Sequence, residues 1–335
     1  MINLGDNAFN NANVPTCIFI MKKHQSDDYN FTYYDSRYLS IEETDFSQVT
    51  TLISRKSVLK NERDLTIGID ETTSNIVEKI AKKSTTINMI CTEVACGISS
   101  GADDVFKIPA AVATQFNIEN SLLNPCIVGG DVFSYCKVET SDVIVYTTRG
   151  MDIDNYPNAK AYLSQFKDRL DQRSETKSGV LPWWCINRSR NKPLFEGKKI
   201  ILRQTSDRII ATIDENNLFT LDSLLIVRLI NECDYEFVLG VMNSNIGIYI
   251  YKNVSQEEGR TFAQVKPQNV RKLFIPNKTD IKETISNLVR ECLTIKSLDA
   301  NGDINSQLES INAALYQYYE LTDEEINLIE KEIDY

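Results

Sequence analysis

The alternation of apolar and polar positions divides this chain into short strands and amphipathic helices. Thr73 to Ser84 shows helical spacing, with Ile76, Val77 and Ile80 on one face and lysines on the other. Apolar runs that end at polar or turn residues predict strands. The predicted strands are 12–23, 112–116, 138–147, 198–204 and 219–229, and the other predicted helices are 156–173, 235–243, 281–296, 304–318 and 322–333.

This mixture of short strands and helices indicates an α+β fold. We expect mixed small sheets with packed helices, followed by a helical C-terminal extension. The last three helices carry one apolar face each, and the leucines expected on those faces are Leu288, Leu293, Leu308, Leu315 and Leu328. Thr322 and Glu325 have the spacing of a capping box at the start of the final helix.

Two glycine-rich stretches interrupt the pattern. The first, Gly97 to Ile108, reads GISSGADDVFKI, and the second, Leu122 to Tyr135, reads LLNPCIVGGDVFSY. Glycine allows a positive φ or a close approach to another backbone. Both stretches are therefore predicted to be tight loops that join short strands, either as plain turns or as parts of a binding site.

The composition fits a cytoplasmic protein of more than one structural unit. A length of 335 residues suggests two units, and 42% hydrophobic residues suffice for a sizeable core. The chain has no run of about 18 apolar residues and no signal-peptide pattern, so we expect neither a membrane partner nor secretion. The eight cysteines are scattered, with Cys17, Cys126 and Cys292 in apolar surroundings, and are predicted to be reduced, buried and without metal.

Charge is distributed unevenly along the chain. The formal net charge is −11, which by itself argues against DNA binding. Residues 188–208 nevertheless hold seven Lys or Arg against two acidic residues, whereas acidic residues crowd the last dozen positions. The basic window is either a nucleic-acid contact or an ordinary solvated face.

The glycine-rich stretches resemble the specificity region of TaqI-type adenine-N6 DNA methyltransferases and the related type IIG restriction-modification enzymes. Gly97, Ile98, Gly101 and Phe106 match the family's first pattern. The second pattern is matched by Leu123, Pro125, Gly129, Asp131 and Tyr135, with Gly130 where the family usually has Arg. Segment 12–23 resembles the last strand region of the family's catalytic domain. Segments 156–173, 181–208 and 239–252 resemble later family patterns, as does the ending LYQYYELTDEEINLIE.

The resemblance implies a division into four segments. Residues 1–24 would be the edge of a methyltransferase catalytic domain and 25–85 a connection. Residues 86–278 would be a target recognition domain and 279–335 the helical extension. The implied function is DNA sequence recognition in an adenine-specific methyltransferase or restriction-modification system, and the implied partner is double-stranded DNA.

The candidate DNA-binding residues follow from the resemblance and the basic window. Arg188 and Arg190 are two apart and would share one face of a strand, where arginine can make paired hydrogen bonds to guanine. Phosphate contacts are expected from the remaining basic residues. The other candidates are Lys192, Lys198, Lys199, Arg203, Gln204, Ser99, Ser100, Asp103, Gly129, Gly130 and Asp131. Trp183 and Trp184 could stack on a splayed base or pack in the core.

Catalytic signatures are missing from the sequence. The Gly-rich S-adenosylmethionine turn and the Asn-Pro-Pro-Tyr-type loop of the family do not occur, and His24 is the only histidine. An acidic nuclease centre at Asp70 and Glu78 has only chance spacing. The chain alone is therefore expected to hold no cofactor, S-adenosylmethionine belonging to the parent methyltransferase. The alternative function is a protein–protein adaptor that docks on a separate methyltransferase or nuclease subunit.

The missing motifs generate a first prediction. Isothermal titration calorimetry with S-adenosylmethionine should show no binding to the purified chain, and the chain should transfer no methyl group to DNA by itself. A micromolar cofactor site in the titration would contradict this expectation.

Overall fold

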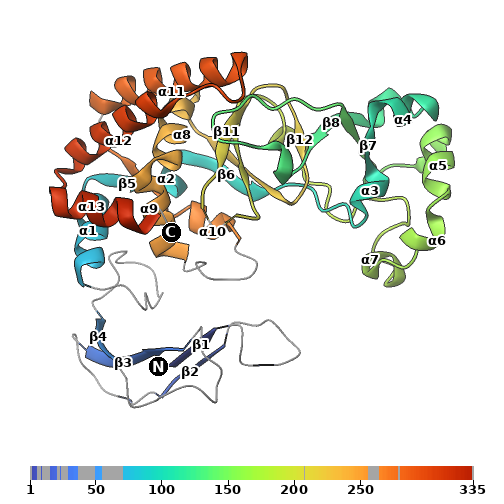
Figure 1. The fold of residues 1–335 in the computed structure, drawn as a ribbon. Coiled ribbons are helices and arrows are strands. Elements are labelled where there is room, and N and C mark those ends of the chain that lie inside the picture. The colour runs from blue at the N-terminus through green and yellow to red at the C-terminus, as the bar shows by residue number, and fades with distance from the viewer. Residues whose placement is uncertain are drawn as a thin grey trace. The chain divides into compact units, whose positions relative to one another are not determined.

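A computed structural model describes most of the chain in two units, Met1–Lys83 and Ser84–Tyr335 (Figure 1). The described residues are 2–5, 9, 16–20, 23, 29–36, 50–54, 71–206, 208–255, 264–277 and 280–333. His24, Asp70 and most of the predicted connection lie outside them. Short sheets and helices alternate along the chain, so the predicted α+β class is confirmed.

The described residues of the first unit include a four-stranded sheet. Its order is β2 (Thr16–Ile18), β1 (Ile2–Gly5), β3 (Tyr29–Asp35) and β4 (Thr50–Ser54). Strand β1 runs antiparallel to β2 and parallel to β3. The predicted helix at 73–84 is confirmed as α1 (Glu71–Lys82), whose Ile76 and Ile80 are fully buried. Because β1–β2 and β3–β4 share a sheet, segments 1–24 and 25–85 are not separate in the structure.

The first sheet of the second unit is fully antiparallel. Its order is β11 (Ala211–Asp214), β10 (Lys199–Arg203), β13 (Leu224–Leu229) and β6 (Cys91–Cys96). The strand predicted at 198–204 is thus confirmed as β10. Both β10 and β13 are buried along almost their whole length, which explains their nearly continuous apolar sequence.

The second sheet of this unit has the order β12 (Phe219–Thr220), β8 (Leu123–Ile127), β9 (Asp142–Val145) and β7 (Lys107–Pro109). Strand β12 is parallel to β8, and the other pairs are antiparallel. Strands β12 and β13 come from one predicted strand, 219–229, and lie in different sheets. Residues 221–223 therefore carry the chain from one sheet to the other.

Short helices gather beside the second sheet, as Figure 1 shows. They are α3 (Asp103–Phe106), α4 (Ala110–Gln115), α5 (Pro157–Ser164), α6 (Lys167–Leu170) and α7 (Ser174–Lys177). The strand predicted at 112–116 is wrong, because α4 occupies it. The sequence AAVATQ after Pro109 begins with two alanines, which favour helix over strand.

The helix predicted at 156–173 is broken. Phe166 leaves the helical conformation, with φ −109° and ψ 8°, and separates α5 from α6. Its ring packs edge-on against Tyr162 at 5.5 Å between centroids, in the core of this region. Helix α5 begins at Pro157, where Glu119 accepts hydrogen bonds from the amides of Asn158 and Ala159 at 2.9 and 3.0 Å.

The remaining helices, apart from α2, pack on one another. They are α2 (Ile87–Ile90), α8 (Tyr235–Asn243), α9 (Asn245–Ser255), α10 (Pro267–Val270), α11 (Asp280–Leu298), α12 (Asn305–Tyr319) and α13 (Asp323–Ile333). A two-stranded sheet of β5 (Ser84–Thr86) and β14 (Phe274–Pro276) accompanies them. Helix α11 packs on α8 and α12, and α13 on α9. The four predicted helices from 235 onward are therefore confirmed.

The apolar faces of the C-terminal helices differ in detail from the prediction. Leu315 is buried, but Leu288, Leu293, Leu308 and Leu328 are only half-buried. The fully buried positions are instead Ile285, Val289, Cys292, Ile311, Tyr319 and Ile329. The capping box is confirmed, since Thr322 N donates to Glu325 Oε2 at 2.8 Å and Glu325 N donates to Thr322 Oγ1 at 3.3 Å.

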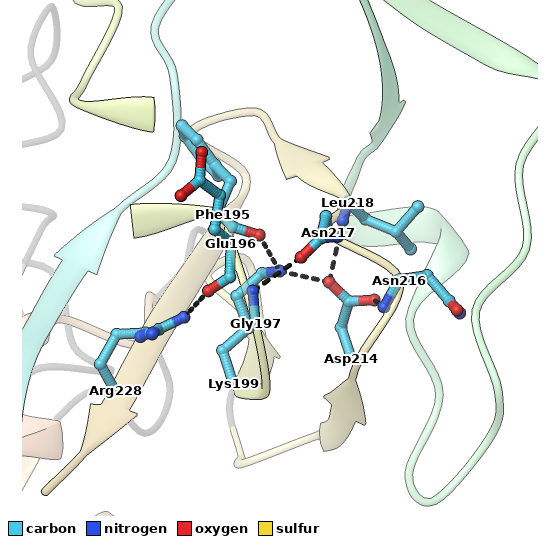
Figure 2. A network of polar contacts seen from close by, with 9 residues as sticks. All are labelled: Phe195, Glu196, Gly197, Lys199, Asp214, Asn216, Asn217, Leu218 and Arg228. Atoms are coloured by element: carbon cyan, nitrogen blue, oxygen red, sulfur yellow. Dashed lines mark hydrogen bonds and ion pairs between the residues drawn. The ribbon is translucent and has the colours of Figure 1, made fainter. Parts of the chain in front are cut away.

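A buried ion pair joins β10 to β11. Lys199 and Asp214 are register partners at the end of the two strands, and their side chains are 0% and 1% exposed. Figure 2 shows the surrounding network: Lys199 Nζ also donates to Phe195 O at 2.6 Å, and Asp214 accepts the amides of Asn216 and Leu218 at 2.8 and 3.0 Å. Burial lowers the pKa of the Lys199 ammonium, and the Asp214 carboxylate opposes that shift. The pair thereby fixes both the turn after β11 and the turn before β10.

Removal of one partner from this pair should be costly. We expect Lys199→Met to lower the free energy of unfolding by about 3–5 kcal/mol, because the Asp214 carboxylate remains buried without its cation. Adding Asp214→Asn should restore part of the loss, since the amide is neutral and its oxygen still accepts a backbone N–H. Urea denaturation measures both variants, with Lys137→Met, an exposed lysine paired with Glu139, as the control that leaves stability nearly unchanged.

Close packing of α8 on α11 gives another stability prediction. A Cβ at Gly240 would lie 2.7 Å from Ile285 Cγ2 and 2.8 Å from Val289 Cγ2. Gly240→Leu should therefore separate the helices and lower the free energy of unfolding by about 1–3 kcal/mol or more, despite its gain in helix propensity. Thermal unfolding followed by circular dichroism tests this, and a melting temperature equal to or above that of the parent chain would refute the close packing.

Candidate nucleic-acid interface

The turn between β12 and β13 holds the two glycine-rich loops together. Gly97 N donates to Leu224 O at 2.9 Å, and Ile98 N donates to Thr220 O at 2.8 Å. From the other loop, Gly129 N donates to Ser223 Oγ at 2.9 Å. Residues 220–224, hereafter the crossover turn, therefore bring together two stretches that the sequence predicted separately.

Three of the four glycines in these loops have a structural reason to be glycine. A Cβ on Gly97 would lie 2.2 Å from Leu221 O, and one on Gly129 would lie 3.0 Å from Ser223 O. Gly101 has a φ of +77°, and its Cβ would meet the Asn187 amide. By contrast, Gly130 is exposed, and a Cβ there would meet nothing within 4 Å. The loops are predicted correctly as close approaches and turns.

The segment with Arg188 and Arg190 pairs with the first loop but is not a strand. Ser99 N donates to Arg188 O at 3.2 Å and Arg188 N to Ser99 O at 2.9 Å, as an isolated antiparallel bridge. Arg190 then adopts a left-handed conformation with φ 59°. The expectation that both arginines share one strand face is therefore wrong, because the extended backbone ends between them.

The two arginines also differ in how far their side chains are engaged. Arg190 is half-buried, and its Nε donates to Gly97 O at 3.1 Å. Tyr146 Oη donates to the Arg190 carbonyl at 2.6 Å and holds the backbone there. Arg188 is exposed, and its guanidinium has no hydrogen bond or ion pair with a described residue. Lys192 is also exposed, with its ammonium 5.4 Å from the Tyr146 ring centroid.

The end of β10 adds side chains from the other side of the crossover turn. Gln204 N donates to Ser223 O at 2.9 Å. Arg203 Nε donates to Val132 O at 2.6 Å, just after the loop Gly129–Asp131. Asp131 accepts the amide of Val128 at 2.8 Å and is otherwise exposed. The crossover turn thus brings together predicted candidates from four separate segments. These segments are 99–103, 129–131, 188–192 and 203–204.

Three predicted contacts do not belong to this surface. Lys199 is fully buried with Asp214, so it is not available to a phosphate. Lys198 lies at the same end of β10 and pairs with Glu236 and with Glu215, the latter at 3.1 Å. Ser100 is buried, and its Oγ accepts the Ala102 amide at 3.0 Å and donates to Asp103. These residues carry the structure of the domain instead.

The two tryptophans serve the core. Trp184 is 9% exposed and belongs to the cluster around β12, β8 and β9, against which Trp183 packs. Thr147 Oγ1 donates to the Trp184 carbonyl at 2.6 Å. The core-packing alternative is therefore the one that the structure supports.

Arg173 is a structural arginine that the sequence did not single out. Its guanidinium donates to the carbonyls of Ser100 at 3.0 Å, Trp183 at 2.7 Å and Leu170 at 3.2 Å. Burial lowers its pKa from the ordinary value. It fastens the first glycine-rich loop to the segment before Arg188. No sequence pattern connects Arg173 with these partners, so its structural role could not be predicted from the sequence.

Other chemistry is sparse in the part of the chain that the structure covers. No cluster of three His, Cys, Asp or Glu side chains suitable for a metal occurs among the described residues. None of the described helices combines the length and apolar character needed to cross a membrane. All eight cysteines are free, and burial raises the pKa of Cys126 to about 12 and of Cys185 to about 11. Cys17 and Cys233, which were predicted to be buried, are exposed.

A comparison with known protein families finds a match in the middle of the chain. The family model described as "TaqI-like C-terminal specificity domain" matches residues 145–275. The matched residues include Arg188, Arg190, β10 and the crossover turn, so the resemblance stated from the sequence is confirmed there. The two glycine-rich stretches precede the matched range.

A solved structure of another protein shows a similar fold. The type IIL restriction-modification enzyme MmeI, determined in complex with DNA, matches with a TM-score of 0.51 and 13% identity over 91% of this chain and 40% of that one. The type IIG restriction endonuclease BpuSI matches with a TM-score of 0.44 and 11% identity over 87% and 40%. The chain thus spans about two fifths of the length of either protein. Among curated proteins, no sequence matches.

Proposed function

We propose that this chain is the DNA sequence-recognition module of a restriction-modification system. The TaqI-like specificity domain supports this proposal, as does the fold shared with a restriction-modification enzyme that was solved with DNA. The observation that carries the proposal is the assembly of polar loops and arginines around the crossover turn. Arginine and amide side chains on loops held by a rigid scaffold are suited to reading base edges.

Within this interface, the side chains divide into base readers and phosphate contacts. Arg188 is exposed, free of protein partners among the described residues, and next to the rigid Gly97 loop, so it is the leading base reader. Arg190 and Gln204 are half-buried neighbours that complete the readout surface. Lys192 and Arg203 supply positive charge for the DNA backbone.

Charge segregation supports DNA binding despite the net charge of −11. Arg188, Arg190 and Arg203 lie around the crossover turn, whereas Lys198 and Lys199 are paired with acidic residues. The acidic C-terminal residues belong to α13, which packs on α9. Local positive charge at the interface is what attracts DNA, since the field depends on the distribution of charge.

In this proposal, catalysis is carried out by another domain or subunit of the restriction-modification system. Methyl transfer from S-adenosylmethionine would be carried out by a methyltransferase domain, in the same protein or in a separate subunit, while this module selects the target. The adaptor alternative required apolar helix faces free to dock on a partner. Helices α11, α12 and α13 bury those faces within their own unit, which favours DNA recognition over the adaptor.

Single substitutions can separate base reading from phosphate binding. Duplexes enriched by the parent chain from a randomised 30-base-pair pool serve as target, with scrambled duplexes for comparison. Arg188→Ala should weaken target binding by about 1–3 kcal/mol and relax the preference at one base pair. Lys192→Ala should weaken both duplexes alike and reduce the salt slope by about 1, because one phosphate contact is lost.

Two controls make the result specific. Lys198→Ala should leave DNA affinity unchanged because its ammonium is already paired with Glu236, and Lys331→Ala alters an exposed lysine of α13. Fluorescence anisotropy at several salt concentrations measures all variants. If Arg188→Ala and Lys192→Ala match the parent chain on both duplexes, the interface around the crossover turn is not the DNA-binding surface.

A further inference from the structure

One aromatic side chain stands out from the candidate interface into solvent. Phe133 follows the loop Gly129–Asp131 and is 55% exposed. In the described part of the second unit it is the only exposed aromatic residue. Exposure of one apolar side chain is common and decides nothing by itself. What distinguishes Phe133 is how rigidly the structure holds it.

The backbone on both sides of Phe133 is anchored. Val132 is fully buried, and its amide donates to Gly129 O at 3.3 Å. Tyr135 is 1% exposed, and its amide donates to Ala211 O of β11 at 3.2 Å. The Cys136 amide donates back to Phe133 O at 3.1 Å. The ring therefore projects from a fixed base between two buried residues.

Arg203 fixes the ring itself. Its guanidinium carbon lies 4.6 Å from the Phe133 ring centroid, within the range of a cation–π contact. The same guanidinium is oriented by the hydrogen bond from Nε to Val132 O at 2.6 Å. Its terminal nitrogens donate to no described residue. The Phe133 ring is therefore supported by the Arg203 guanidinium, whose terminal N–H groups remain available to a ligand.

The location links this pair to the interface. Gly129 is tied to Ser223 Oγ in the crossover turn, and Gln204, the residue after Arg203, is tied to the Ser223 carbonyl. Gly130 has open space where a side chain would be, so the loop before Phe133 presents no bulk that would keep a large ligand away. Asp131, the acidic neighbour, has one carboxylate oxygen engaged by the Val128 amide.

We propose that Phe133 inserts into the base stack of bound double-stranded DNA, with Arg203 behind it directed at the adjacent backbone. This inference rests on the proposed DNA-recognition function and adds a residue that the sequence patterns did not indicate. Apolar side chains placed between base steps partly unstack them, and aromatic rings stack on any base. A rigid ring suits this role because little side-chain entropy is lost on insertion.

The test uses the full chain with substitutions at the tip of the proposed wedge. Phe133→Ala removes the ring, Phe133→Trp keeps an aromatic face, and Met89→Ala alters another exposed apolar side chain of the same unit as a control. The probe is the duplex enriched by the parent chain, with 2-aminopurine placed in turn at each purine position. Unstacking of this base raises its fluorescence.

We expect Phe133→Ala to weaken binding about 5- to 100-fold and to abolish a fluorescence rise that the parent chain causes at one step. The salt slope should not change, since the substitution removes no phosphate contact. Phe133→Trp should retain both properties, and Met89→Ala should match the parent chain. An unchanged melting temperature for Phe133→Ala confirms that only the exposed ring was lost.

Two results would overturn the inference, and only the second would also overturn the proposed function. If Phe133→Ala equals the parent chain in affinity and fluorescence while Arg188→Ala weakens binding, Phe133 is an ordinary surface residue and DNA recognition stands. If the parent chain enriches no duplex and does not bind the randomised pool, the proposed function fails together with this inference.

Discussion

The second unit depends on the close approach of two backbones at Gly97. A Cβ on Gly97 would clash with the carbonyl oxygens of Thr220 and Leu221, so no side chain fits there. Two chain segments cross at this point. Strand β6 of the first sheet ends at Cys96, and Ile98 then bridges to Leu221 beside the second sheet. Residues 221–223 pass in the opposite sense, from β12 in the second sheet to β13 in the first.

This crossing explains why the loops around it are held rigidly, as the proposed recognition of DNA requires. Each loop is fastened to the crossover turn or to its neighbours by backbone hydrogen bonds, and Arg173 and Tyr146 add side-chain ties to carbonyl oxygens. Interaction sites built on loops require such support, because the positions of the contacting groups must be set before binding. The proposed interface thus consists of exposed side chains on backbone that has little freedom.

Strand β10 has opposite roles at its two ends. At its start, Lys199 is buried with Asp214, and Lys198 is neutralised by two glutamates. At its end, Arg203 is held against Phe133 with donors to spare. The same basic sequence therefore contributes fold stability at one end and positive surface charge at the other. Counting charges in a sequence window cannot make this distinction, because it depends on which acidic residues the fold brings near.

The sequence by itself determined the fold class, the resemblance to a TaqI-like specificity domain and the position of the loops. Glycine spacing, helical periodicity at 235–243 and 322–333, and the apolar run at 198–204 are local signals that packing preserved. Local sequence patterns gave wrong predictions where the surrounding tertiary structure determined the secondary structure. Residues 112–116 lack strand partners and form a helix, and Phe166 breaks a helix whose periodicity looked continuous.

Only the tertiary structure decided which candidate residues share a surface. Four segments between Ser99 and Gln204 meet because the crossover turn, hidden within one predicted strand, exchanges the chain between two sheets. It also removed Lys199 and Ser100 from that surface and added Phe133. Hydrogen bonds between residues far apart in the chain leave no spacing pattern in the sequence. Their geometry arises only when both sheets are assembled.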